Sequence, residues 1–300
     1  MKVVLTGAGG FLGRHILETL SGREQYEVIA LTSQTDALQS QYAGDNRICV
    51  MQSKEYGQID FSKIDLLISC AFPTKPDDGI GLAQGMQYVC QLLCTASEAG
   101  VEQIIDISTQ SVYGTQRSSE ADEQTIINLD TKYAAGKYYT ELMLNEICHR
   151  SRVVHYRMTS LIGPGYDQRI TNVLIRRLIE GAPLRIVDGK QVMGYMDVRD
   201  GAEAVVDSIP FLRQVPHKEI FNIAGEAHSL FEITDTIVKV GYEYGLTADS
   251  IIREETGKTR NTGLNASKFR STFEWQPRYS LEEAIREIYK EMLSVEKKVK

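Results

Sequence analysis

Residues 6–13 read TGAGGFLG, and this stretch decides the fold. It follows a short apolar run at residues 2–5, which predicts a strand, and it leads into a helical pattern at residues 14–20. Three glycines recur at every third position, where one permits a tight turn, one lets backbone approach a phosphate, and one lets helix and strand pack closely (Gly7, Gly10 and Gly13). Because free N–H groups at a helix N-terminus favour an anion, the stretch predicts binding of a dinucleotide pyrophosphate.

The rest of the chain alternates short apolar runs with longer amphipathic stretches, the pattern of a parallel sheet covered by helices. Strands are predicted at residues 26–31, 47–51, 65–71, 103–107 and 152–157, with long helices at 82–99 and 131–148 and a returning strand at 219–223. We therefore predict an α/β, doubly wound parallel-sheet Rossmann fold with a smaller, mainly C-terminal substrate lobe. The dinucleotide-binding domain is expected at residues 1–162, with returning segments near 195–224, and the substrate lobe at 163–194 and 225–300.

The end of the second predicted strand bears on the choice of cofactor. A carboxylate there would bond the ribose 2′-hydroxyl of NAD, but Thr32 and Ser33 occupy the position and the next carboxylate is Asp36. Two neutral hydroxyls do not repel a 2′-phosphate and can donate to it, and Arg14 is the candidate cation nearby. The sequence therefore favours NADP slightly over NAD. The other predicted cofactor contacts lie within the glycine stretch and after a buried strand (Phe11, Leu12 and Ala71).

A second constellation combines the run DISTQSVYG at residues 106–114 with TKYAAGKYYTE at residues 131–141. Tyr133 and Lys137 are four apart, so a helix places both side chains on one face. A phenol has a pKa of about 10 in water, and a nearby ammonium favours the phenolate and lowers that pKa. Such a tyrosine can exchange a proton with a substrate hydroxyl while a nicotinamide takes up or gives hydride. Thr109, at the end of a strand, would hydrogen-bond the same substrate oxygen.

Together these runs resemble the short-chain dehydrogenase/reductase superfamily, and within it the extended branch of sugar-nucleotide epimerases and dehydratases. The later segments RMTSLIGPG, DVRDGAEAV and FNIAG are also similar to that branch, so the resemblance covers nearly the whole chain. It implies that Tyr133 is the acid/base, that Lys137 lowers its pKa and holds the nicotinamide ribose, and that Thr109 positions the reacting oxygen. It also implies a homodimer formed through helices 82–99 and 131–148.

Departures from the branch bear on the substrate. In its 4,6-dehydratases an Asp–Glu pair that performs elimination follows the catalytic threonine, whereas Gln110 and Ser111 stand here, which disfavours dehydration. An asparagine near the diphosphate corresponds to Ser160, and an arginine that clamps the diphosphate corresponds to Met193, which cannot make that contact. Asn172 and Arg260 match remaining diphosphate-binding positions, and Arg169, Arg176 and Arg177 are further cations. The predicted substrate-binding residues are Thr109, Gln110, Ser160, Asn172 and Arg260.

Composition excludes several other classes of protein. The 300 residues carry 33 basic and 40 acidic side chains, a net charge of −7, so bulk attraction to nucleic acid is not expected. No apolar run approaches the roughly 20 residues of a membrane helix. The five cysteines form no CxxC pair, which favours reduced thiols in the cytoplasm and no metal site.

Three functions stay open at this level. The favoured one is an NAD(P)-dependent epimerase or reductase acting on a carbinol or ketone of a nucleotide-activated sugar. The alternatives are an NADPH-dependent reductase of a non-nucleotide carbonyl, which Met193 and Ser160 motivate, and a cofactor-binding sensor without catalysis, which the three catalytic side chains argue against.

Overall fold

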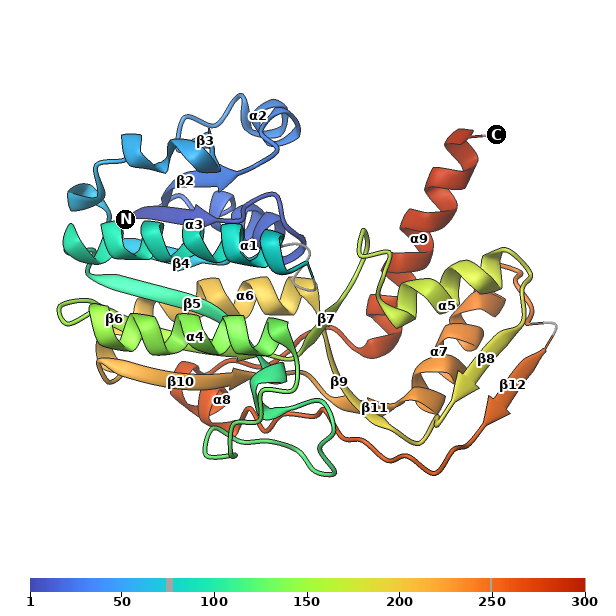
Figure 1. Ribbon diagram of the computed structural model, residues 1–300. Coiled ribbons are helices and arrows are strands. Elements are labelled where there is room, and N and C mark those ends of the chain that lie inside the picture. Colours follow the sequence, from blue (N-terminus) through green and yellow to red (C-terminus); the bar gives the residue numbers. More distant parts are fainter. Residues whose placement is uncertain (74–77, 249, 300) are drawn as a thin grey trace.

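The computed structural model describes residues 1–73, 78–248 and 250–299, and within these ranges seven parallel strands form one sheet (Figure 1). Their order across the sheet is β10-β6-β5-β4-β1-β2-β3. The strands predicted from the sequence are confirmed, with boundaries that shift by a few residues. They are β1 (Lys2–Thr6), β2 (Glu27–Thr32), β3 (Ile48–Gln52), β4 (Leu66–Ser69), β5 (Gln103–Thr109), β6 (Arg152–Met158) and β10 (Lys218–Ile223).

Helices cover both faces of this sheet, because successive strand residues point to opposite sides and both sides are apolar. Val3 and Leu5 of β1 belong to one hydrophobic core, with α1 (Phe11–Ser21) and α6 (Val198–Ser208). Val4, between them, belongs to the opposite core, with α3 (Gly79–Glu98) and α4 (Lys132–Ile147). Shorter helices connect the strands: α2 (Asp36–Tyr42) and the 3₁₀ helices η1 (Ser53–Gln58), η2 (Phe61–Lys63), η3 (Gln110–Tyr113) and η4 (Ile209–Gln214).

The strand order reverses between β1 and β4. From β1 the chain proceeds to β2 and β3 on one side, and β4, β5, β6 and β10 then extend the sheet on the other. In sheets of this kind, ligands bind at the carboxyl ends of the strands where the order reverses. The glycine stretch follows β1 directly and Ala71 follows β4, so both lie at this switch point.

A smaller lobe stands beside the carboxyl ends of the sheet (Figure 1). In the described part of the chain it holds a three-stranded sheet, β11-β9-β7, and a two-stranded sheet, β12-β8. Its helices pack around a core of their own, which includes Leu174, Ile237 and Ile288. The elements are β7 (Ser160–Ile162), α5 (Ile170–Ile179), β8 (Leu184–Val187), β9 (Val192–Asp197), β11 (Ala227–Ser229), α7 (Leu230–Glu243), β12 (Ile251–Glu254) and α9 (Leu281–Val299). None of the described helices is both long and apolar enough to cross a bilayer.

We expected segment 225–300 to belong wholly to the smaller lobe. In the structure this segment is divided between the smaller lobe and the large lobe. Helix α8 (Ser267–Phe273) packs on β10 at the edge of the large sheet. Phe269, Phe273 and Trp275 are all buried in the same core as α1 and α6. Packing these large aromatic side chains against the large sheet buries much apolar surface, and this burial stabilises the position of the stretch on the large lobe.

Candidate active site

The glycine stretch forms a tight turn against β4. Gly7 has φ +68°, and a Cβ there would lie 2.9 Å from the Ala71 Cα. A Cβ on Gly13 would lie 2.0 Å from the Gly7 carbonyl oxygen, so only glycine lets α1 approach the turn this closely. Gly10 caps α1 without a side-chain hydrogen bond, and the first turn carries no acidic residue. The helix N-terminus therefore fits a pyrophosphate, which accepts from free backbone N–H groups.

The other predicted residues of this loop take different orientations. The Thr6 hydroxyl accepts hydrogen bonds from the Cys70 and Ala71 N–H groups, each at 3.0 Å, and so fixes Ala71 beside the turn. The Leu12 side chain is buried in the core, which leaves only its backbone for a cofactor. The Phe11 ring packs on Tyr166, with ring centroids 4.7 Å apart, and thus joins the loop to the chain that enters the smaller lobe.

Thr32 and Ser33 lie at the end of β2, as predicted. The Thr32 side chain is buried, and its Oγ1 accepts from the Gln34 N–H at 3.1 Å, while Ser33 is exposed. Arg14, the expected cation beside them, is engaged elsewhere. Its Nη2 donates to the Pro164 carbonyl at 2.5 Å, because the first turn of α1 faces the segment that leads out of β7. The 2′-phosphate position therefore gains no cation from Arg14.

Tyr133 and Lys137 lie in the first half of α4, whose start is set by the Thr131 hydroxyl accepting from the Ala134 N–H at 3.1 Å. Lys137 is 4% exposed, and its Nζ donates to the Ile107 carbonyl of β5 at 2.6 Å. This bond ties the helix to the strand that ends at Thr109, so all three predicted catalytic residues are brought to one end of the sheet.

Phe72 joins this group, although the sequence reasoning did not include it. Its ring meets the Tyr133 ring edge-on, with centroids 5.2 Å apart and planes at 87°, and its centroid lies 4.6 Å from the Lys137 ammonium. Gly136 lies between Tyr133 and Lys137 in the sequence. A Cβ there would lie 2.9 Å from the Phe72 ring, so the absence of a side chain makes room for that ring. The one sequence signal for Phe72 was its position as an aromatic residue directly after Ala71, at the switch point.

Thr109 and Gln110 lead from β5 into η3. The Thr109 hydroxyl accepts from the Ser111 N–H at 3.2 Å, and Gln110 Nε2 donates to the Ser160 hydroxyl at 3.0 Å. Two predicted substrate-binding residues thus lie in contact, although they are fifty positions apart in the chain. Gln110 Oε1 is buried and lacks a hydrogen-bond partner among the described residues, so it retains an acceptor for a ligand.

A buried ion pair fixes α4 on the sheet beneath the catalytic residues. The Glu141 carboxylate accepts from Arg157 Nε at 3.0 Å, from Arg157 Nη2 at 2.6 Å and from the Ser108 hydroxyl. Arg157 also donates to the Tyr113 hydroxyl, which donates to Asn222 Oδ1 at 2.8 Å. Burial alone lowers the pKa of Arg157, but its bonds with Glu141 outweigh burial and raise that pKa above its ordinary value. These bonds therefore favour the charged form of the Arg157 guanidinium.

The two predicted diphosphate-binding residues differ in their accessibility. Asn172 is fully buried, and its Nδ2 donates to the Gly163 carbonyl at 3.1 Å, so its side chain supports the loop before α5. Its binding of a diphosphate stays a prediction. Arg260 is partly buried, with an Nε that has no hydrogen-bond partner in the described part of the chain.

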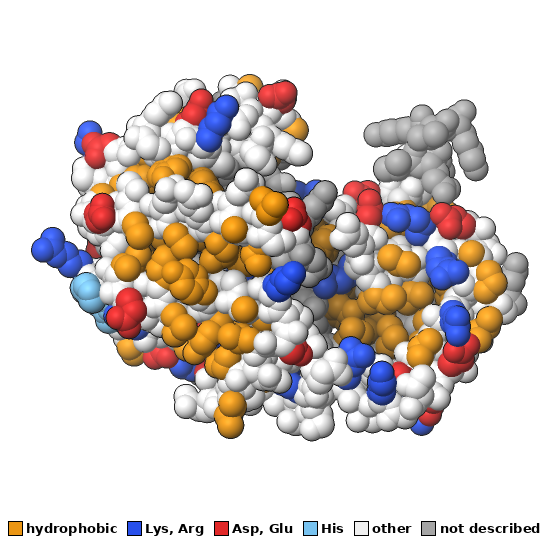
Figure 2. Space-filling model, in the orientation of Figure 1, with side chains coloured by type: hydrophobic (Ala, Val, Ile, Leu, Met, Phe, Trp, Pro, Cys, Tyr) orange, Lys and Arg blue, Asp and Glu red, His pale blue; other side chains and the backbone are white. Residues whose placement is uncertain are grey.

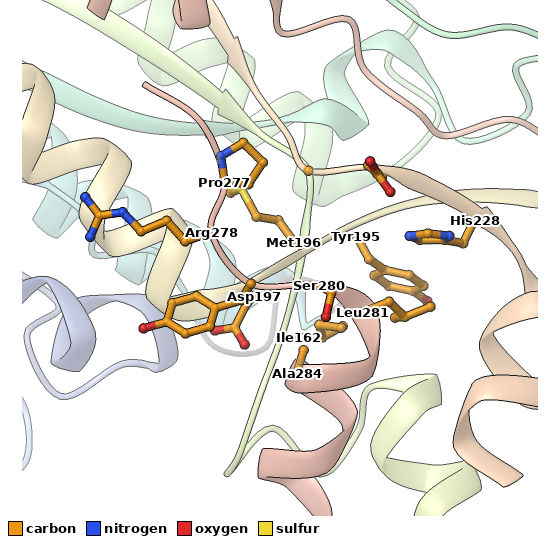
Figure 3. Close-up of a pocket in the computed structure, with 13 residues that line it drawn as sticks. Ile162, Tyr195, Met196, Asp197, His228, Pro277, Arg278, Ser280, Leu281 and Ala284 are labelled. Carbon is orange, nitrogen blue, oxygen red and sulfur yellow. The ribbon is translucent and has the colours of Figure 1, made fainter. Parts of the chain in front are cut away.

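A cavity of about 260 Å³ lies elsewhere, between β9, β11 and the turn before α9 (Figure 3). Tyr195, Asp197 and His228 line it together with residues 277–281, but the catalytic candidates do not. Next to it the buried Asp200 carboxylate accepts from the Arg278 and Tyr279 N–H groups at 2.8 and 3.1 Å. Burial raises the pKa of Asp200 to about 6. This region connects the two lobes and is distinct from the Tyr133 site.

Residues 3–224 match the family model described as the NAD dependent epimerase/dehydratase family. The chain belongs to this family. Among curated relatives it is 24% identical over 305 residues to the low-salt glycan biosynthesis protein Agl12 of Haloferax volcanii, covering 95% of this chain and 96% of that protein. It is 23% identical over 283 residues to the bifunctional polymyxin resistance protein ArnA of Wigglesworthia glossinidia brevipalpis, covering 80% of this chain and only 41% of that longer protein.

Solved structures share the fold of this epimerase/dehydratase family member. The Bacillus cereus UDP-glucuronic acid 4-epimerase in complex with NAD has a TM-score of 0.81 at 22% identity, covering 98% of this chain and 99% of that one. The Bacillus anthracis dTDP-glucose 4,6-dehydratase in complex with NAD also has a TM-score of 0.81, at 18% identity, covering 99% and 98%. At these identities the likeness establishes the Rossmann fold of the chain.

Proposed function

We propose that this protein is an NAD(P)-dependent epimerase or reductase that acts on a carbinol or ketone of a nucleotide-activated sugar. The observation that supports the proposal is the bond from Lys137 to the Ile107 carbonyl, which holds the helix of Tyr133 and Lys137 on β5 two residues before Thr109. β5 lies next to β4, and β4 and the glycine loop meet at the switch point. The names of the relatives support the substrate class, since they include epimerases and a dehydratase of UDP-, dTDP- and ADP-linked sugars.

The dinucleotide supplies a nicotinamide that accepts hydride from the carbinol carbon or returns it to the ketone. The glycine loop binds its pyrophosphate, Ala71 borders it, and Thr32 and Ser33 face the adenosine ribose. The Tyr133 hydroxyl takes the proton from the substrate hydroxyl or gives it back, and Thr109 hydrogen-bonds the same oxygen. Lys137 lies one turn from Tyr133, where it stabilises negative charge on the phenol oxygen and reaches the ribose.

The smaller lobe, together with Gln110 and Ser160, binds the sugar nucleotide in this proposal. Gln110 and Ser111 are neither acids nor bases, so the site lacks the pair of groups that elimination of water needs. Reversible oxidation is therefore favoured over dehydration. An epimerase retains its cofactor and turns over without added dinucleotide, whereas a reductase consumes it.

The test replaces Tyr133 by phenylalanine, with Tyr138→Phe on the same helix as the matched control. Tyr133→Phe is expected to abolish turnover of a UDP-sugar panel while dinucleotide binding, measured by calorimetry, stays close to wild type. Tyr138→Phe should retain turnover. Full activity of the Tyr133 variant would overturn the catalytic assignment, and consumption of NADPH during turnover would exclude the epimerase.

One observation favours a second function, reduction of a non-nucleotide carbonyl. Met193 is partly buried, and its sulfur accepts the Tyr195 hydroxyl at 3.5 Å, so this position presents a thioether to the smaller lobe. An apolar carbonyl compound would suit such a surface better than a diphosphate. Thermal stabilisation by a nucleoside diphosphate at modest concentration would exclude this second function.

For the cofactor we retain the slight preference for NADP on the hydroxyls of Thr32 and Ser33, although the neighbouring structures contain NAD and Arg14 points away. The rise in melting temperature that NAD and NADP each cause distinguishes the two cofactors. A larger shift with NAD than with NADP would overturn the preference.

We also propose a cytoplasmic homodimer that forms through α3 and α4. Tyr139 and Leu142 of α4 are 55% and 47% exposed, and Figure 2 shows hydrophobic side chains gathered over these two helices. All five cysteines, each within the described residues, are free, which fits a reducing compartment. Sedimentation of wild type and of Leu142→Glu tests the dimer: the wild type should sediment as a dimer and the variant as a monomer. A monomeric wild type would exclude it.

A further inference from the structure

A turn at residues 163–166 (GPGY) lies between β7 and α5, where the ribbon runs between the two lobes (Figure 1). Two helices of the smaller lobe hold this turn. The Gly163 carbonyl accepts from Asn172 Nδ2 of α5 at 3.1 Å, and the Gly165 N–H donates to the Glu291 carboxylate of α9 at 2.8 Å. A displacement of the turn therefore acts on both α5 and α9.

The first turn of α1, which follows the glycine loop, holds the same four residues from the other side. Arg14 Nη2 donates to the Pro164 carbonyl at 2.5 Å, and the Phe11 ring packs on the Tyr166 ring with centroids 4.7 Å apart. Gly165 has φ +77°, and a Cβ there would lie 2.6 Å from Arg14 Nη2, so a glycine lets the turn approach α1 this closely. The turn is thus bonded to the glycine-loop helix and to the smaller lobe at once.

This arrangement gives a physical route between the two predicted binding sites. Phe11 is the first residue of α1, so its backbone N–H is among those that we expect a dinucleotide pyrophosphate to bind. A pyrophosphate there would restrain the Phe11 backbone and, through the paired rings, Tyr166 and the turn. Because the turn is bonded to α5 and α9, the smaller lobe would then lose less conformational entropy when it binds a second ligand.

We propose that Tyr166 is a positioning residue that couples the two sites, so that the bound dinucleotide strengthens binding of the nucleotide sugar. The inference rests on the proposed function, which assigns that substrate to the smaller lobe. Tyr166 acts through the Phe11 ring and not on a reacting atom. Coupling of binding free energies is reciprocal, so the nucleotide sugar strengthens binding of the dinucleotide by the same factor.

The test measures this factor by calorimetry on the full chain. UDP is titrated into the protein alone and into protein saturated with NAD, with a parallel series in NADP. In wild type the dinucleotide should lower the Kd of UDP about 2- to 10-fold, the range that corresponds to one aromatic ring pair. In Tyr166→Ala the two Kd values of UDP should be equal within error. Titration of NAD with and without UDP must give the same factor as the first experiment.

Three further variants distinguish coupling from a general loss of packing. Tyr166→Phe keeps the ring that contacts Phe11 and should keep the wild-type factor. Tyr242→Ala makes the matched change at a tyrosine of the smaller lobe that is 59% exposed, and it should keep the factor too. Phe11→Leu removes the other ring of the pair but keeps the backbone N–H, so it should abolish the factor. It also takes the place of Tyr166→Ala should that variant fold poorly.

The outcomes separate the inference from the function beneath it. If wild type binds UDP and the dinucleotide independently, the inference is overturned while the proposed function stands. If Tyr166→Ala binds both ligands more weakly but keeps the wild-type factor, the ring has a structural role only and the inference is again overturned. If wild type binds none of UDP, ADP and dTDP, the proposed substrate class fails and the inference fails with it.

Discussion

Replacement of Glu141 by alanine tests whether the buried ion pair holds α4 in place. The Glu141 and Arg157 side chains are 2% and 3% exposed, and the carboxylate accepts from Arg157 twice and from Ser108 once. Removing it leaves a guanidinium buried with the Tyr113 hydroxyl as its remaining acceptor. Breaking a buried pair from one side costs about 3–5 kcal/mol, because the surviving charge stays out of water.

The matched control replaces both partners, as Glu141→Leu with Arg157→Met. Apolar side chains of similar size remove both desolvated charges, and such replacements range from neutral to stabilising by about 1–4 kcal/mol. The double variant should therefore be more stable than Glu141→Ala, although it changes two buried positions. This ordering follows from desolvation, and simple loss of contacts would predict the reverse.

Urea unfolding gives the free energy of unfolding of the wild type and of each variant, with the fluorescence of Trp275 as the probe. Trp275 is the sole tryptophan and is 4% exposed, so unfolding transfers it to water. A Glu141→Ala variant within about 1 kcal/mol of wild type would refute the assigned cost of the unpaired charge. A double variant less stable than Glu141→Ala would refute the desolvation argument.

Three further changes follow from the site and its surroundings. Ser33→Asp should weaken NADP by about tenfold or more through repulsion of the 2′-phosphate and leave NAD binding intact; equal loss of both in calorimetry would contradict it. Phe72→Leu removes the ring contacts with Tyr133 and Lys137, so kcat should fall about tenfold with dinucleotide affinity little changed, and an unchanged kcat would contradict this. Because burial raises the pKa of Asp200 to about 6, folding stability from this group is present at low pH and is lost as pH rises from about 4 to about 6. Urea unfolding across that window should show this loss in wild type and not in Asp200→Asn, and parallel profiles would contradict the assignment.

The large sheet could be predicted because its signals are local. Val3, Val4 and Leu5 are all apolar since both faces of β1 are covered, and the glycines follow at once where the turn must touch β4. The spacing of Tyr133 and Lys137 likewise encodes a shared helix face without any tertiary information. Residues that stand next to one another in sequence thus determined the strand, the loop and the catalytic pair.

The smaller lobe and the substrate side depended on contacts between distant segments. The sequence did not indicate that Asn172 is buried or that its amide donates to the Gly163 carbonyl, nine positions away. Phe72 acquires its place only when the first half of α4 packs against the loop after β4, and its position after Ala71 does not by itself distinguish it from an ordinary loop aromatic. The returning helix α8 was missed for the same reason, because Phe269 and Phe273 find their core across the whole fold.

Arginines of one short region differ in whether a carboxylate neutralises their charge. Arg176 is paired with Asp167, although it lies only seven positions from Arg169. The sequence places Arg169, Arg176 and Arg177 together in one segment and does not show which of them form ion pairs. Ion pairing in the folded chain distinguishes them: Asp167 neutralises the charge of Arg176 locally, whereas Arg169 forms no ion pair with any described residue. Local pairing, and not the net charge of −7, therefore decides which arginines of this region keep an uncompensated charge.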